Sequence, residues 1–167
     1  MLNFITGGVC AAQGFRAGGI HVGVKTHAAW KKDVALIVSD EDCACAAVYT
    51  KNAVKAAHIH VDKRHLADGK ARAAVINSGN ANACCPMSHE YAEEMARLAA
   101  RATGRAPADF VVASTGVIGE MAFGRAASGG PVAAFGTAAE RRTGRRGWGE
   151  ALGLIPVAGS LAMAIGY

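Results

Sequence analysis

Two short apolar runs rich in β-branched residues, at residues 73–77 and 110–114, are each followed at once by a string of small polar residues. Runs of this composition between turn-forming residues favour β-strands. Residues 77–82 read Asn-Ser-Gly-Asn-Ala-Asn and residues 114–119 read Ser-Thr-Gly-Val-Ile-Gly. Because α/β proteins place binding and catalytic groups in loops at the ends of buried strands, the pattern predicts an α/β fold with two candidate functional loops.

Length and charge restrict the class of protein. A chain of 167 residues with 51% hydrophobic content is expected to form one soluble globular domain. From Glu120 onward, five arginines stand against three glutamates, so part of the net charge of +5 lies in this last segment. No basic stripe is interleaved with aromatic residues, so we expect no nucleic-acid binding.

Five cysteines without a Cys-x-x-Cys pair indicate small, reduced core residues in a cytoplasmic protein. The first residues lack the basic and apolar regions of a signal peptide. Residues 151–167 carry no charge, but Pro156 interrupts them and they are shorter than the roughly 20 residues of a membrane span, so no membrane anchor is expected.

The secondary structure is predicted from periodicity and turn residues. Strands are expected at residues 21–25, 33–39, 44–50, 54–61, 73–77 and 110–114, joined as a meandering sheet by turns such as those at 40–42 and 67–70. A helix is expected at residues 88–103, with Glu93 paired to Arg97 and with Gly104 ending it, and a weaker one at 133–140.

Thr115 and Gly116 are the most specific candidates for catalytic residues. A threonine hydroxyl beside the unobstructed N–H of a glycine can supply two donors to a developing oxyanion, although a turn without a catalytic role remains the alternative. The asparagines of residues 77–82 are interpreted as a turn with a side-chain hydrogen-bond network. His58 and His60 would share one face of a strand, as metal ligands can, but no third ligand stands at a recognisable spacing. We therefore expect no metal and no cofactor. The histidines are expected to be exposed or to have their hydrogen bonds satisfied.

Five sequence strings in register resemble the ornithine acetyltransferase family, the bifunctional glutamate N-acetyltransferases of arginine biosynthesis. The matching strings are residues 7–20, 32–40, 47–57, 74–83 and 112–119. The resemblance implies a sandwich of mixed β-sheets and helices, and a precursor that cuts itself into an α and a β chain, which assemble as a heterotetramer. It also implies an N-terminal threonine of the β chain as nucleophile, which moves an acetyl group from N-acetylornithine, or from acetyl-CoA in bifunctional members, to glutamate. In this family the oxyanion hole is a Thr-Gly pair, which here is Thr115 and Gly116.

After Gly119 the resemblance decays. Residues 1–119 are therefore predicted to form an α-chain-like domain, and residues 120–167 a divergent segment, through a shifted reading frame or genuine divergence. The last threonine, Thr143, lies in Arg-Arg-Thr-Gly-Arg-Arg, which does not match the family's cleavage site, and Ser160 lies in only a faintly similar setting. The chain alone is expected to lack the nucleophile. A non-catalytic fragment or binding module remains the alternative, and a self-processing aminopeptidase of the related amidase fold matches worse.

Overall fold

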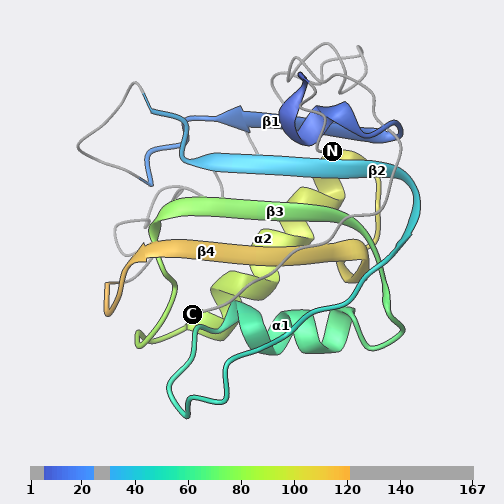
Figure 1. Cartoon of the computed structure of the whole chain (residues 1–167). Coiled ribbons are helices and arrows are strands. Elements are labelled where there is room, and N and C mark those ends of the chain that lie inside the picture. The colour runs from blue at the N-terminus through green and yellow to red at the C-terminus, as the bar shows by residue number, and fades with distance from the viewer. Residues whose placement is uncertain (1–5, 25–30, 121–167) are drawn as a thin grey trace, which may run out of the picture.

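A four-stranded mixed sheet, with one α-helix on one face and a second along one edge, forms the described part of the chain. The computed structural model describes residues 6–24 and 31–120. The strands, in both chain and sheet order, are β1 (Phe15–Ile20), β2 (Val34–Ala44), β3 (Lys70–Asn80) and β4 (Phe110–Val117). The first three are antiparallel neighbours, whereas β4 is parallel to β3. Figure 1 shows β4 at one edge of this sheet.

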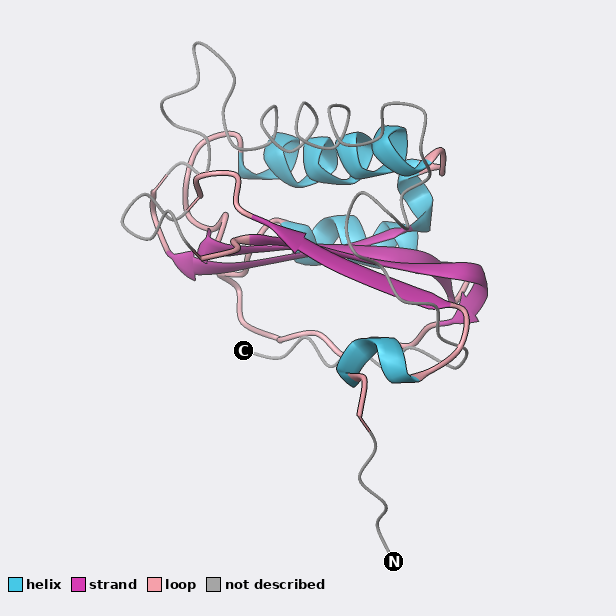
Figure 2. Ribbon diagram, turned by 90° about the horizontal axis from the view of Figure 1, so that it is seen from above, coloured by secondary structure: helices cyan, strands magenta, loops and turns pink. Residues whose placement is uncertain are grey.

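The parallel pair β3–β4 needs a crossover connection, and α2 (Ser88–Thr103) provides it. Figure 2 shows this helix lying along one face of the sheet, with the short turn η1 (Gly8–Ala11) near the other face. The predicted helix at 88–103 is confirmed, and Gly104 ends it in the left-handed conformation (φ 68°). The predicted partnership of Glu93 with Arg97 is wrong, because Arg97 pairs with Glu94 and Glu93 pairs with Arg64 of α1 (His58–His65).

The main core lies between the sheet and α2. The helix contributes residues at intervals of three and four, including Met95 and Leu98, so that one face meets the sheet. Leu36, Val75 and Phe110 from three neighbouring strands lie opposite, and Phe110 is completely buried. This packing fixes the first part of β4, whereas residues 115–117 at its end are exposed.

Several predicted elements differ from the structure. The strand expected at 21–25 is not found in its described part, residues 21–24, because β1 ends at Ile20. The strand at 33–39 is confirmed as part of β2, which continues through the expected turn at 40–42 with a register shift between Val38 and Cys43. The separate strand expected at 44–50 is wrong, because β2 ends at Ala44 and residues 45–50 form no strand. The expected turn at 67–70 is found before β3, and the strands at 73–77 and 110–114 are confirmed within the longer β3 and β4.

The strand expected at residues 54–61 is also wrong, because residues 54–57 form no strand and the first half of α1 occupies residues 58–61. His58, Val61 and Asp62 are buried at spacings of three and four, which is the helical period. Two of these three residues are polar, so the period is hidden in the sequence pattern.

The mixed α/β fold class is confirmed, as a single described sheet with its helices. The helix expected at 133–140, the uncharged run at 151–167, Thr143, Ser160 and His27 lie outside the described residues. Within residues 6–24 and 31–120, no helix has both the length and the apolar character to cross a membrane.

Candidate oxyanion site at the end of the β3–β4 pair

The two polar strings singled out in the sequence lie side by side. In the parallel register of β3 and β4, Ser78 is opposite Thr115 and Gly79 is opposite Gly116. Both strings were expected as loops, but the structure continues β3 to Asn80 and β4 to Val117. The candidate groups therefore stand on paired strands, which hold them more rigidly than a loop would.

Gly79 and Gly116 form a close backbone contact between the two strands. Their φ angles are 128° and 136°, a region that side chains disfavour. A Cβ atom on Gly116 would lie 2.2 Å from the carbonyl carbon of Gly79 and 2.5 Å from the backbone nitrogen of Asn80. The site therefore requires glycine at 116.

Thr115 and Gly116 offer their donors on accessible sides of β4. Ser114 is buried, and its hydroxyl points toward the Met95 sulfur of α2 at 3.8 Å. Because neighbouring side chains alternate across a strand, the exposed Thr115 lies on the opposite face of the sheet. The Thr115 hydroxyl and the Gly116 N–H thus belong to adjacent, exposed residues.

The direction of the Gly116 N–H follows from a contact of β4 with α1. The Val112 N–H donates to Asp62 Oδ1 at 2.8 Å, so it points away from β3. Backbone groups of a strand alternate between its two sides, and Gly116 lies four residues beyond Val112. The same alternation directs the Gly116 N–H toward the outer edge of β4, beyond the part that α1 covers.

α1 covers the first part of this edge with side chains in place of a neighbouring strand. Besides the Asp62 contact, His65 Nδ1 lies 2.7 Å from the carbonyl oxygen of Phe110. Asp62 is fully buried, and its second oxygen has no partner among the described residues. Burial raises the pKa of Asp62 to about 7, although the Val112 N–H acts in the opposite direction.

The histidines do not form the strand pair that the sequence predicted. His58 is buried in α1, its Nδ1 has no partner among the described residues, and burial lowers its pKa to about 4. The prediction that it is exposed or satisfied is therefore wrong. His60 is exposed, with its ring 5.1 Å from that of His89, and His21 is satisfied by the carbonyl oxygen of Lys31 at 2.9 Å.

The asparagine string forms hydrogen bonds to backbone groups, in agreement with the network expected from the sequence. Asn77 donates to the Asn80 carbonyl oxygen at 2.9 Å, and Asn82 donates to that of Ser88 at 2.8 Å. Asn80 donates to the carbonyl oxygen of Glu120 at 3.0 Å. This last contact reaches the segment that follows Gly116 and is not apparent in the sequence.

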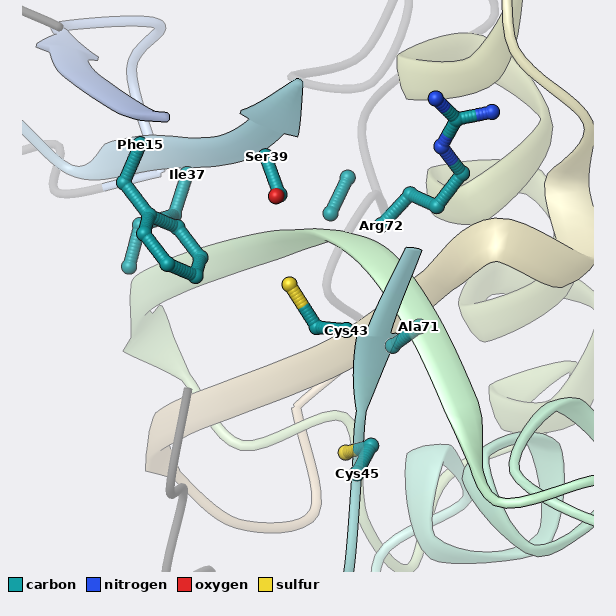
Figure 3. Close-up of a pocket in the computed structure, with 8 residues that line it drawn as sticks. Phe15, Ile37, Ser39, Cys43, Cys45, Ala71 and Arg72 are labelled. Atoms are coloured by element: carbon teal, nitrogen blue, oxygen red, sulfur yellow. The ribbon is translucent and has the colours of Figure 1, made fainter. Parts of the chain in front are cut away.

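A small hollow lies at the opposite end of the sheet from Thr115 and Gly116. Its empty volume of about 230 Å³ includes space open to solvent, so it is not an enclosed cavity of that size. Figure 3 shows the Phe15 ring and the Cys43 sulfur pointing into it, while the guanidinium of Arg72 turns away. The five cysteines are free, but they are half-buried or exposed, which corrects the expectation that they are core residues.

Comparisons with known proteins agree on one family. The sequence model of the ArgJ family matches residues 16–134. The arginine biosynthesis bifunctional protein ArgJ of Symbiobacterium thermophilum is 49% identical over 119 residues, which are 71% of this chain and 30% of the relative. That of Gloeobacter violaceus is 50% identical over 118 residues, which are 70% of this chain and 29% of the relative. The chain thus spans about 30% of the length of these relatives.

Two solved structures share the fold. The arginine biosynthesis bifunctional protein of Bacillus halodurans has a TM-score of 0.70 at 36% identity, over 84% of this chain and 69% of that one. The ornithine acetyltransferase of Mycobacterium tuberculosis, complexed with ornithine, has a TM-score of 0.68 at 33% identity, over 80% of this chain and 68% of that one.

Proposed function

Because the chain belongs to the ArgJ family, we propose that it is the part of an ornithine acetyltransferase that supplies the oxyanion hole. The observation that carries this proposal is that Gly116, whose N–H faces the outer edge of β4, is exposed next to the exposed Thr115. The reaction moves an acetyl group from N-acetylornithine, or from acetyl-CoA, to glutamate. The ornithine in the Mycobacterium tuberculosis structure supports this class of substrate.

The two donors act where charge develops during acyl transfer. Attack of a hydroxyl on the acetyl carbonyl opens its double bond and leaves a negative charge on the carbonyl oxygen. The Thr115 hydroxyl and the Gly116 N–H donate to that oxygen, which stabilises the tetrahedral intermediate. When the intermediate collapses, the amine of ornithine leaves with a proton and the acetyl group stays on the nucleophile. Glutamate then attacks the acyl-enzyme through the same hole.

The nucleophile is proposed to lie on another polypeptide. In the family that the chain resembles it is the N-terminal threonine of a β chain, whose own amine can serve as the base. We propose that such a β chain is the partner of this chain, which contributes residues 1–119 to the shared site. The purified 167-residue protein is therefore expected to show no transfer by itself. The alternative, a non-catalytic fragment or binding module, predicts no transfer with any partner.

Complementation tests the proposal. The protein is mixed with the part of the Symbiobacterium thermophilum relative that follows the matched 119 residues, and transfer from N-acetylornithine to glutamate is measured. We expect transfer from the mixture only. Thr115→Val should lower kcat by about 10² to 10³, the usual cost of removing one oxyanion donor. Thr50→Val is the matched control, because its hydroxyl only accepts the Asn52 N–H at 3.2 Å.

Each outcome has a clear meaning. An unchanged kcat in Thr115→Val shows that this hydroxyl is not an oxyanion donor. Transfer by the 167-residue protein alone contradicts the division of the site between two polypeptides. A mixture that forms a stable complex without transfer favours the non-catalytic alternative.

A further inference from the structure

We propose that Asn80 is a positioning residue that orients the Gly116 N–H through the segment that follows it. The inference rests on the proposed role of Thr115 and Gly116 as the oxyanion hole. Asn80 touches neither donor with its side chain in the described contacts, and its effect passes through the backbone at Val117–Glu120.

The side chain of Asn80 joins two segments that are distant in sequence. It is 6% exposed, and both ends of its amide are used. The nitrogen donates to the carbonyl oxygen of Glu120 at 3.0 Å, and Oδ1 accepts the Asn82 N–H at 2.7 Å. This position needs a side chain that both donates and accepts a hydrogen bond. An ionised carboxylate cannot replace the amide, because it only accepts.

Two backbone hydrogen bonds accompany this contact. The Ala81 N–H donates to the carbonyl oxygen of Val117 at 2.9 Å, and the Gly119 N–H donates to that of Ala83 at 2.9 Å. Residues 80–83 therefore run beside residues 117–120, immediately after the paired glycines. Together these bonds continue the connection between the two strands beyond the end of β4.

Hydrogen bonds rather than packing hold this segment of the described chain. Val117 and Ile118 are 50% and 66% exposed, so little apolar burial fixes them. Gly116 itself has a φ of 136°, and glycine permits many other conformations. The preceding strand sets the side of β4 on which the Gly116 N–H lies, and the tilt of this peptide group also depends on what holds the residues that follow. Among the described residues, Asn80 is the one whose side chain hydrogen-bonds to residues 117–120.

The test replaces the donor while keeping the shape of the side chain. Asn80→Asp retains the acceptor for the Asn82 N–H but places a carboxylate oxygen against the carbonyl of Glu120. We measure the amide hydrogen exchange and the ¹H–¹⁵N chemical shifts of Gly116 and Gly119 in the 167-residue protein. Exchange at Gly119 should become about tenfold faster, as expected for the loss of one hydrogen bond of ordinary strength, and the Gly116 signal should shift.

The matched control is Asn52→Asp. Asn52 is exposed, and its Oδ1 accepts the Val54 N–H at 3.1 Å, which aspartate can do equally well. The same chemical change is therefore expected to leave both glycine signals unaltered. In the complemented mixture, Asn80→Asp should lower kcat about tenfold with little change in KM, because the lost hydrogen bond affects the transition state more than substrate binding.

The amide signals decide the inference separately from the proposed function. If Gly116 and Gly119 behave in Asn80→Asp as in the wild-type protein, Asn80 does not position them and the inference is overturned. It is also overturned if the signals change and kcat does not, while Thr115→Val lowers kcat as expected. If Thr115→Val has no effect on transfer, the proposed function fails, and the shift of the two glycine signals still tests whether Asn80 orients this backbone.

Discussion

Replacement of Asp62 by asparagine should remove a pH-dependent loss of stability that arises where α1 meets β4. The Asp62 side chain is fully buried, and its Oδ2 has no partner among the described residues. Burial raises its pKa from 3.8 to about 7. The amide of Asp62→Asn can accept the Val112 N–H as Oδ1 does, but it cannot ionise.

The sign of the effect follows from proton binding. Between about pH 4 and pH 7 the folded protein keeps the Asp62 proton, whereas the unfolded chain releases it. The folded state therefore binds more protons, and the free energy of unfolding falls as the pH rises through this range. The difference between a pKa of 3.8 and one of about 7 corresponds to roughly 4 kcal/mol. The Asp62→Asn variant should gain about this much relative to the wild-type protein between pH 4 and pH 8.

Urea denaturation, followed by the helical circular dichroism signal at a series of pH values, measures this difference. Other titrating groups are present in both proteins, so most of their effect cancels when the two free energies are subtracted. Asp68→Asn is the control, because the exposed Asp68 accepts the Lys70 N–H at 3.0 Å and water solvates it in both states. A difference between wild type and Asp62→Asn that stays constant with pH would refute the reasoning, since the buried carboxyl would then carry no penalty for its charge.

The remaining predictions concern packing and one histidine. Gly116→Ala should destabilise the protein by about 3 kcal/mol or more, because its Cβ would overlap Gly79; a normal urea midpoint would contradict this contact. Phe110→Ala should cost about 3 to 5 kcal/mol in the same assay, since the ring is 0% exposed, and a loss below 1 kcal/mol would argue against its burial. His58, with its pKa lowered to about 4, binds fewer protons folded than unfolded, so stability should fall by about 3 kcal/mol from pH 6.5 to pH 4. His58→Gln should lack this loss, and an equal slope in both proteins would exclude the mechanism.

Local patterns in the sequence were sufficient for much of the fold. The helix at 88–103 was predicted with its bounds because its apolar spacing, its acidic first turn and Gly104 all act within a few residues. The strands around 33–39, 73–77 and 110–114 were found because their apolar runs are continuous. The replacement of an expected strand by α1 was not found, because buried His58 and Asp62 interrupt its apolar pattern.

The sequence by itself identified the two polar strings as candidate functional segments and Thr115 and Gly116 as candidate oxyanion donors. Only the tertiary structure decided that Gly79 lies against Gly116, that Asn80 reaches Glu120 and that Asp62 covers the edge of β4. These contacts join residues up to 50 positions apart. Such pairings depend on strand register and on helix packing, which are set by burial over the whole domain, and therefore no local pattern contains them.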